Sequence, residues 1–319
     1  MKNKKCLYCY QELKDASIDF HAACSKKIFG KTSPPELPYT EKQMRELAEK
    51  VVRSSVTVTG VQPKLSLDIA KAEKPKEPQR FTIVGLIGGY ILKPPTENFK
   101  HLPEVEDLTM HLAEISKIKT VPHSLIRLQN GSLSYITKRI DRNKSEKSHM
   151  EDMCQLTERL TEHKYDGSYE QIAKAILQYS ANPVLDVVNF YEQVVFSFLT
   201  GNADMHLKNF SLLNQPGIGY TLAPAYDMVA SQLVNKDDKE ELALTLNGKK
   251  RKIKRNDFLK AFKTSQMEEK VSATIFSKFE KSFTKWNAFI DISFIPQTMK
   301  REYKQMIREK AKQLELKTF

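Results

Sequence analysis

Apolar residues in the second half of the chain recur at the spacing of buried helices. The clearest run consists of Val187, Val188, Tyr191, Val194, Val195, Phe198 and Leu199, which fall on one helical face. Gly201 follows this run and predicts its end, because glycine readily adopts the left-handed backbone found after helices. Helical periodicity dominates from about Asn143 onward, so we expect a mainly helical C-terminal lobe over 143–319.

The chain before residue 143 contains shorter apolar runs that are typical of strands. Residues 54–67 predict a strand, a turn and a second strand, and residues 90–93 predict an apolar strand that ends in Lys93. Helical spacing returns briefly at 105–113. Residues 71–80 hold three lysines and two prolines, which is typical of an exposed hairpin loop. We therefore expect a strand-rich N-terminal lobe over 31–142.

A second short hairpin is predicted directly after the long helical run. Residues 210–213 and 220–223 predict two strands, and residues 214–217 supply most of the turn between them. We expect this hairpin to bring residues 224–228 back beside Asp204.

The segment between the helix and this hairpin carries the most specific chemical pattern, Asp204-x-His206-x-x-Asn209. Phosphoryl transfer needs a carboxylate that orients or deprotonates the attacking hydroxyl, and oxygen ligands for the magnesium ion that bridges the phosphates. Asp204 fits the first requirement and Asn209 the second, although both residue types also form ordinary turns. Asp227 lies where kinases place a second metal ligand. We expect His206 to orient Asp204 or the loop backbone, and Lys208 could contact the transferred group or simply be exposed.

Candidates for the nucleotide phosphates lie upstream. Lys93 could pair with them and be held by Glu106 or Glu104, or be an ordinary exposed lysine. The turn near Gly60 has small and hydroxylated residues whose amides could approach phosphate, but a single glycine makes this a weak pattern. The proposed phosphate-binding residues are Thr59, Gly60, Gln62, Lys64, Lys93 and Glu106, where Gln62 and Lys64 could instead support the loop.

Four blocks in this order make the pattern much more specific. They are residues 59–66, residues 91–94 with 103–106, residues 201–211 and residues 222–227. From about Ser54 to its C-terminus the chain resembles the HipA-family serine/threonine kinases, the toxins of bacterial toxin-antitoxin systems. Only some fifty residues precede the first block, so the chain resembles the shorter, HipT-like branch. The resemblance implies a two-lobed, protein-kinase-like α+β fold that uses ATP and Mg²⁺, related to the phosphatidylinositol kinases.

The resemblance also implies regulation and partners. Members of the family autophosphorylate beside the glycine-rich loop, and the candidate acceptors here are Thr57, Thr59, Ser54 and Ser55. A phosphate there would repel the phosphates of bound ATP. The family leads us to expect a protein substrate such as an aminoacyl-tRNA synthetase and a helix-turn-helix antitoxin, with DNA contacted through that antitoxin. A kinase for a lipid or small-molecule hydroxyl, and a non-catalytic module that binds nucleotide or antitoxin, remain alternatives.

The first 30 residues carry a separate pattern, Cys6-x-x-Cys9 followed by His21-x-x-Cys24. Two ligand pairs at this spacing predict one tetrahedral zinc site. A segment this short buries little apolar surface, so a metal would stabilise it. The competing interpretation is three free thiols and a surface histidine. Cys154 is expected to be a buried small side chain.

Charge and composition change this picture little. The formal net charge is +12, with basic runs at residues 249–255 and 300–312, yet such runs are usually solvated faces. No nucleic-acid reader motif accompanies them, so direct nucleic-acid binding is not expected. No apolar run reaches membrane-spanning length, and the polar start 1–5 does not resemble a signal peptide. We therefore expect a cytoplasmic enzyme without a membrane partner.

Overall fold

The structure is a computed structural model that describes residues 4–44, 46–47, 64–70, 79–84, 88–143 and 146–318. Two compact units make up the chain. The first contains residues 1–107, 121–146 and 292–294, and the second contains residues 108–120, 147–291 and 295–319.

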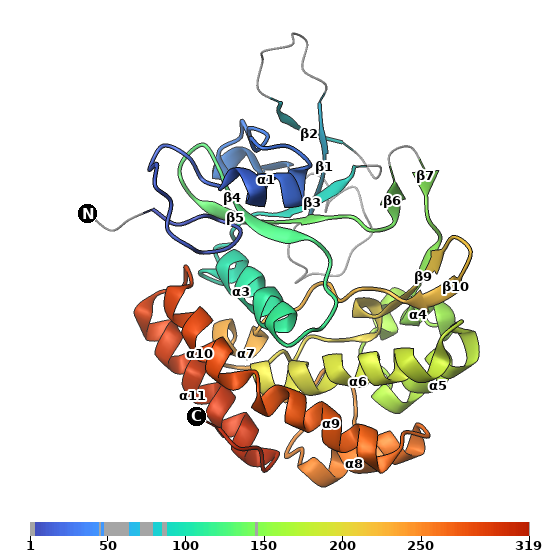
Figure 1. Cartoon of the computed structure of the whole chain (residues 1–319). Helices are drawn as coiled ribbons and strands as arrows, with labels where there is room; N and C mark the ends of the chain where they lie inside the picture. Colours follow the sequence, from blue (N-terminus) through green and yellow to red (C-terminus); the bar gives the residue numbers. More distant parts are fainter. Residues whose placement is uncertain are drawn as a thin grey trace. The chain divides into compact units, whose positions relative to one another are not determined.

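An antiparallel sheet forms the centre of the first unit (Figure 1). Its strands are β1 (Leu65–Ile69), β2 (Phe81–Ile83), β3 (Tyr90–Lys93), β4 (His123–Arg127) and β5 (Leu133–Lys138), in the order β2-β1-β3-β5-β4. Lys93 pairs with Tyr135 in the register of β3 and β5. In the central strand β3, Tyr90, Leu92 and Lys93 are buried and Ile91 is half-buried. The short strands β6 (Arg142–Asn143) and β7 (Glu146–Lys147) pair with each other.

The N-terminal segment packs against this sheet. Its helix α1 (Ala22–Phe29) places Phe29 in a cluster with Phe81 and Tyr90. The rings of Phe81 and Tyr90 meet edge to face, with their centroids 5.3 Å apart. At the other edge, the Leu125 amide of β4 donates to the Leu7 carbonyl at 3.3 Å. The segment is therefore part of the first unit's core. Helix α3 (Leu102–Ile115) begins in the first unit and continues into the second.

The second unit is mainly helical. Its α-helices are α4 (Met153–Leu156), α5 (Tyr169–Tyr179), α6 (Pro183–Thr200), α7 (Ser231–Val234), α8 (Arg255–Thr264), α9 (Glu269–Glu280), α10 (Phe283–Ile292) and α11 (Gln297–Gln313). Helix α6 is the core element, since Phe190, Phe196 and Phe198 are fully buried on different sides of it. Each such side chain stabilises the fold by about 1.5–3 kcal/mol relative to exposure. This unit also contains a small antiparallel sheet. Its strands are β8 (Met150–Asp152), β9 (Ser211–Gln215) and β10 (Gly219–Leu222), in the order β10-β9-β8.

Several predictions from the sequence are confirmed. The helix ends at Thr200 with Gly201 in the left-handed region, and the hairpin after it is β9–β10. Residues 90–93 form a strand and residues 105–113 lie within α3. The α+β character, with strands mainly in one unit and helices in the other, is also as expected. Residues 54–63 and 71–78, which include the predicted phosphate turn and most of the predicted exposed loop, lie outside the described residues.

The predicted division at residues 30 and 142 differs from the division into units. Residues 1–30 share a unit with the sheet, and that unit extends to residue 146. It also lacks residues 108–120, since α3 is divided between the units. The separate domain status of the first 30 residues stays a prediction.

Candidate active site

The end of helix α6 positions the loop with the Asp-x-His-x-x-Asn pattern. Gly201 has a φ of 68°, and a Cβ built on it would lie 2.6 Å from the sulfur of Met306. Glycine is thus the residue that this turn accommodates without strain. The next amide, of Asn202, donates to the Ser197 carbonyl at 2.8 Å. The loop therefore leaves the helix in a fixed direction.

Asp204 is half-buried and already accepts a hydrogen bond. The Tyr165 hydroxyl donates to its Oδ1 at 2.6 Å, while the Asp204 amide donates to Asn202 Oδ1 at 3.2 Å. Burial and the Asp204 charge together raise the pKa of Tyr165, so this hydroxyl keeps its proton. An alcohol that receives a phosphoryl group would need to donate the same kind of hydrogen bond to the Asp204 carboxylate.

His206 is buried in the same loop, with 6% of its surface exposed. Burial lowers its pKa to about 4, despite the opposing charges of Asp204 and Asp227. The ring packs edge-on against Tyr165 with centroids 5.0 Å apart. A neutral, packed imidazole is better suited to positioning the loop than to carrying a proton, and the orienting role of His206 stays a prediction.

Asn209 lies in the short 3-10 helix η2 (Leu207–Asn209) and is tied to Asp204. Its Nδ2 donates to the Asp204 carbonyl at 2.9 Å. This bond makes Oδ1 the amide atom suited to a metal ion. The loop thus couples the positions of the two residues that carry the predicted chemistry.

The β9–β10 hairpin returns the chain to this loop, as predicted. Tyr226 bonds to the Ser211 hydroxyl at 2.5 Å and donates to the Lys208 carbonyl at 3.0 Å. Asp227 follows with a φ of 55°, an uncommon backbone for a residue that is not glycine. Such backbones occur often at functional sites because the surroundings must impose them. Tyr226 therefore anchors the segment that presents Asp227.

Lys208 is held by an ion pair that the sequence did not predict. Its Nζ lies 2.6 Å from Oδ2 of Asp152, and Oδ1 of Asp152 accepts from the Gln155 amide to cap α4. The sequence indicated only a phosphate contact or simple exposure for Lys208, and did not indicate an ion pair. Tyr165 was missed as well, because no local spacing links either pair: 39 residues separate Tyr165 from Asp204, and 56 separate Asp152 from Lys208.

In the first unit, Lys93 and Glu106 form a buried ion pair. Lys93 is 4% exposed and Glu106 is 1% exposed, which rules out the exposed-lysine interpretation. Glu104 instead pairs with His101 at 3.2 Å. The Lys93 ammonium also lies 5.4 Å from the centre of the Tyr135 ring. Lys64 is exposed just before β1, whereas Thr59, Gly60, Gln62 and the acceptor candidates Ser54, Ser55 and Thr57 lie outside the described residues.

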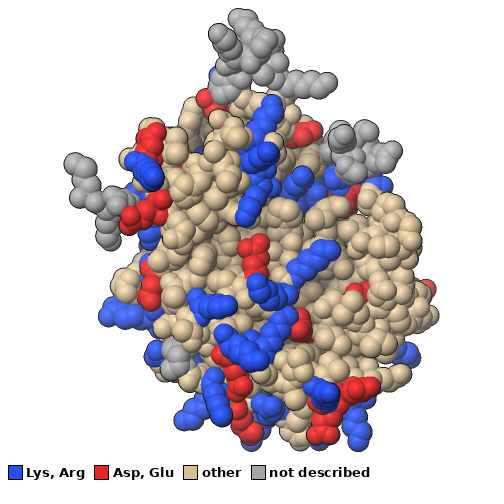
Figure 2. All heavy atoms as spheres, viewed as in Figure 1, with Lys and Arg blue, Asp and Glu red and all other residues tan. Residues whose placement is uncertain are grey.

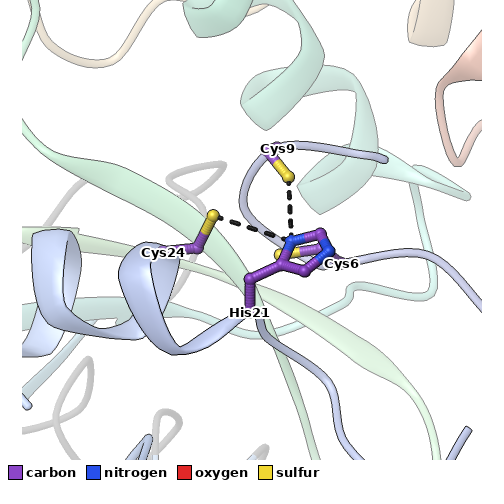
Figure 3. Close-up of side chains that lie close together, drawn as sticks. All are labelled: Cys6, Cys9, His21 and Cys24. Atoms are coloured by element: carbon purple, nitrogen blue, oxygen red, sulfur yellow. Dashed lines mark hydrogen bonds between the residues drawn. The ribbon is translucent and has the colours of Figure 1, made fainter. Parts of the chain in front are cut away.

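The N-terminal cysteines and histidine converge on one point (Figure 3). The Nδ1 atom of His21 lies 3.4 Å from the Cys9 sulfur and 3.9 Å from the Cys24 sulfur. With Cys6 included, the four ligand atoms all lie within 4.8 Å of one another. Ligands of one tetrahedral zinc ion are separated by roughly 3.5–3.8 Å, given the usual Zn–S and Zn–N bond lengths.

The second nitrogen of His21 supports the same arrangement. Its Nε2 lies 3.1 Å from the Glu12 carbonyl, which can only accept, so Nε2 carries the proton. The lone pair of a neutral ring is then on Nδ1, the atom that faces the sulfurs. Zinc-binding histidines usually donate their other nitrogen in this way. The residues therefore fit a zinc ion.

Some lysines of the two basic runs form ion pairs. Lys249 pairs with Asp257 at 2.8 Å, and Lys310 pairs with Glu241 at 3.2 Å. On the face shown in Figure 2, Asp and Glu side chains are interspersed among the Lys and Arg side chains. This arrangement agrees with solvated faces, as expected from the sequence. Among the described residues, no helix combines the length and apolar character needed to cross a bilayer.

Residues 56–309 match the model of the HipA-like C-terminal domain family. The chain belongs to this family. A protein of Haemophilus influenzae with a provisional kinase name is 29% identical over 208 residues, which cover 61% of this chain and 58% of the relative. The serine/threonine-protein kinase toxin HipA of Shewanella oneidensis is 26% identical over 212 residues, which cover 60% of this chain and 47% of the relative. The chain thus matches about half the length of these curated relatives.

Solved structures agree on the fold. HipA of Shewanella oneidensis, solved with HipB and operator DNA, superposes with a TM-score of 0.66 at 19% identity, covering 84% of this chain and 70% of that one. The proinflammatory kinase CtkA of Helicobacter pylori gives a TM-score of 0.52 at 19% identity, covering 70% and 87%. The HipA-type, kinase-like fold expected from the sequence is therefore confirmed.

Proposed function

We propose that this HipA-family chain transfers the γ-phosphoryl group of ATP to a serine or threonine hydroxyl of a protein. The observation that best supports this proposal is that hydrogen bonds join Asp204, Asn209 and the segment of Asp227. Asn209 donates to the Asp204 carbonyl, and Tyr226 attaches the following segment to the Lys208 carbonyl. These contacts hold a carboxylate and two potential metal ligands on one rigid loop system, which phosphoryl transfer requires.

In the proposed reaction, Asp204 accepts a hydrogen bond from the substrate hydroxyl in place of Tyr165. The substrate oxygen forms a bond to the γ-phosphorus, the bond from that phosphorus to the bridging oxygen breaks, and ADP leaves with the electron pair. The hydroxyl proton passes to the Asp204 carboxylate. Asn209 and Asp227 would hold Mg²⁺, which neutralises charge on the phosphates. Lys93, held by Glu106, would bind the phosphates.

Regulation and partners are proposed on similarity. The named HipA relative is a toxin, and its solved complex includes HipB and operator DNA. We propose a comparable antitoxin partner for this chain, a translation-related protein such as an aminoacyl-tRNA synthetase as substrate, and autophosphorylation between Ser54 and Thr59. We also propose that Cys6, Cys9, His21 and Cys24 bind a structural Zn²⁺ ion, because their geometry fits one.

The test compares wild-type protein with Asp204→Asn after incubation with magnesium and ATP. Asparagine keeps an acceptor for Tyr165 but removes the proton-accepting charge, so transfer should fall by about 10²–10⁴-fold. Intact mass and peptide mapping would locate any added phosphate. Nucleotide affinity, measured with a fluorescent ATP analogue, should stay within about threefold.

The outcomes separate the proposed kinase from a binding module. Phosphate gained by the wild type alone supports the kinase. Equal phosphate gain in both proteins removes Asp204 from its role. Tight nucleotide binding with no transfer to itself or to a panel of cellular proteins, from protein that begins unphosphorylated, favours the non-catalytic module.

A further inference from the structure

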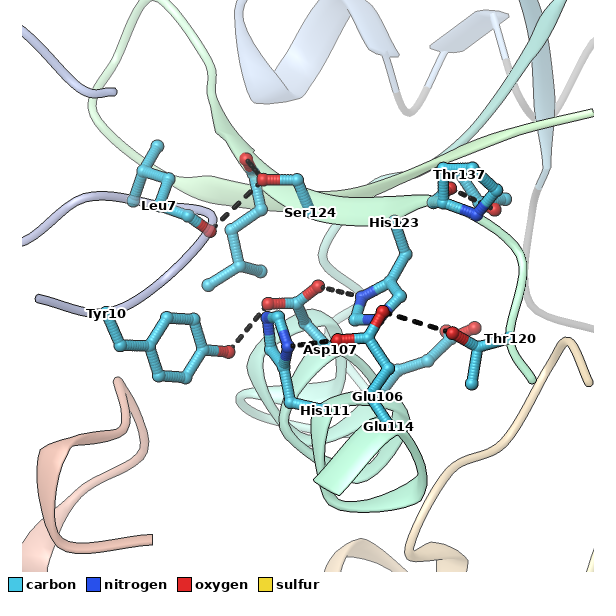
Figure 4. A network of polar contacts seen from close by, with 12 residues as sticks. Leu7, Tyr10, Glu106, Asp107, His111, Glu114, Thr120, His123, Ser124 and Thr137 are labelled. Carbon is cyan, nitrogen blue, oxygen red and sulfur yellow. Dashed lines mark hydrogen bonds and ion pairs between the residues drawn. The ribbon is translucent and has the colours of Figure 1, made fainter. Parts of the chain in front are cut away.

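The zinc-ligand segment touches helix α3 through one buried tyrosine. Tyr10 directly follows Cys9, is 1% exposed and has a φ of 62°. Its hydroxyl donates to Oδ2 of Asp107 at 2.6 Å (Figure 4). Asp107 is completely buried. A buried carboxylate needs such donors, so this contact contributes to the stability of the helix position.

Asp107 is held from a second side by the sheet. Nδ1 of His123, on β4, lies 2.7 Å from the other oxygen, Oδ1. The carboxylate therefore joins three parts of the first unit: the N-terminal segment, β4 and the start of α3. A carboxylate bonded through both oxygens, from two directions, leaves the helix little freedom to rotate or slide.

The neighbouring helical residue is Glu106, the partner of Lys93. Consecutive helical residues point about 100° apart, so Asp107 and Glu106 face different surroundings while sharing one backbone. Any rotation of α3 that moves Asp107 also moves Glu106. The contacts of Asp107 are therefore among those that fix where Glu106 holds the Lys93 ammonium.

The position of Tyr10 depends in turn on the Cys/His cluster. The Tyr10 amide donates to the Cys6 carbonyl at 3.0 Å, and the Cys6 amide donates to the Gln11 carbonyl at 2.9 Å. Tyr10 thus belongs to the turn that carries Cys6 and Cys9. Thiols and an imidazole this close together attract one another weakly, whereas a metal ion would join all four strongly.

We propose that metal binding at Cys6, Cys9, His21 and Cys24 positions the Lys93–Glu106 pair through Tyr10 and Asp107, so that the metal ion and the nucleotide bind cooperatively. Tyr10 and Asp107 act as positioning residues. The inference rests on the proposed zinc site and on the proposed phosphate-binding role of Lys93. Because such coupling is reciprocal, nucleotide should also tighten retention of the metal.

The central variant is Tyr10→Phe, which removes one hydroxyl and keeps the ring that packs on Phe294 at 4.7 Å. Its matched control is Tyr303→Phe. Tyr303 is also fully buried, and its hydroxyl lies 3.2 Å from Oγ1 of Thr109 on the same helix, but it belongs to the second unit. Both variants lose one buried hydroxyl that contacts α3, and only one of them loses the link to the metal segment.

Five samples are compared: wild type and Tyr10→Phe, each with zinc and after chelation, and Tyr303→Phe with zinc. With zinc present, Tyr10→Phe should retain its metal and bind a fluorescent ATP analogue about 5–10-fold more weakly, while Tyr303→Phe stays within about twofold. Chelation should weaken binding by a similar factor in the wild type and add little in Tyr10→Phe, because both changes break the same link. Hydrogen exchange at residues 104–108 should be faster in Tyr10→Phe and in the chelated wild type than in the zinc-bound wild type.

A second readout does not depend on nucleotide binding to the metal-free chain. The release of zinc to a chromogenic chelator should be slower with ATP in the wild type, and unaffected by ATP in Tyr10→Phe. Equal losses of affinity on chelation in both proteins, or equal behaviour of Tyr10→Phe and Tyr303→Phe with zinc bound, would overturn the coupling. If chelation unfolds the whole chain, the zinc-bound comparison of those two variants decides.

Failure of the proposed function gives a different result. A wild-type chain that binds no nucleotide refutes the proposed kinase, yet exchange at residues 104–108 with and without zinc still tests the link to α3. A chain that binds nucleotide but shows unchanged exchange in every sample refutes the link and leaves the kinase proposal standing.

Discussion

The Cys/His segment and the catalytic loop both gather polar side chains, but different forces hold them. In the loop, buried Ala203, Met205 and Leu207 alternate with the functional residues and anchor the backbone in the core. In the segment, the converging groups are the four ligand side chains themselves. Apolar burial can preform the loop without any ligand, whereas in the segment the proposed zinc ion would add to the burial of Leu7 and Phe29 against the sheet.

The largest expected effect comes from removing one ligand of the segment. Cys6→Ser should reduce bound zinc from about one ion per chain to near zero and destabilise the first unit by on the order of 4 kcal/mol. Metal analysis by mass spectrometry and thermal unfolding measure the two effects. Cys154→Ser is the matched control, because Cys154 is a buried cysteine of the second unit, outside the cluster. Zinc that is absent from the wild type, or retained in full by Cys6→Ser, contradicts the proposed site.

The stability of the loop should respond to pH through His206. Its folded pKa of about 4 lies below the usual value of 6.5, so on acidification the unfolded chain takes up a proton before the folded chain does. Stability is therefore complete above pH 6.5 and is lost progressively as the pH falls toward 4. Between pH 7.5 and 5.0 the loss attributable to His206 should be about 2 kcal/mol.

Urea unfolding of wild type and His206→Asn at both pH values measures this contribution. The difference between the two proteins isolates His206 from other groups, including the zinc ligands, that also titrate in acid. An identical pH dependence in both proteins would mean that the imidazole protonates in the folded loop without penalty.

The sequence predicted the parts of the molecule that local spacing controls. The helix ending at Gly201, the β9–β10 hairpin and the strand ending in Lys93 all follow from periodicity and turn residues. Glu106 and Glu104 could not be distinguished, because the choice depends on how α3 packs against β3. That packing leaves Glu106 beside Lys93 and Glu104 beside His101.

Contacts between distant residues were missed for a related reason. Tyr10, Asp107 and His123 meet through the packing of three separate elements, and no spacing in the sequence links them. Lys208 and Asp152 meet in the same manner, through the pairing of β8 with β9. The candidate ligands were predictable from residue types, but the side chains that position them follow from tertiary structure.

The smallest expected effect concerns Tyr165, which donates to the carboxylate that the substrate hydroxyl would use. In Tyr165→Phe this competing donor is lost, so KM for the protein substrate should fall by about threefold. The change in kcat should be equally small, since water replaces the hydroxyl of a side chain that is 39% exposed. Tyr169→Phe is the control, because Tyr169 is buried and donates to the Met205 carbonyl at 3.0 Å. That change should lower stability by about 1 kcal/mol and leave KM unchanged. A loss of kcat greater than about thirtyfold in Tyr165→Phe would make this tyrosine part of the reaction itself, and the loop would then depend on a residue outside the Asp-x-His-x-x-Asn pattern for its chemistry.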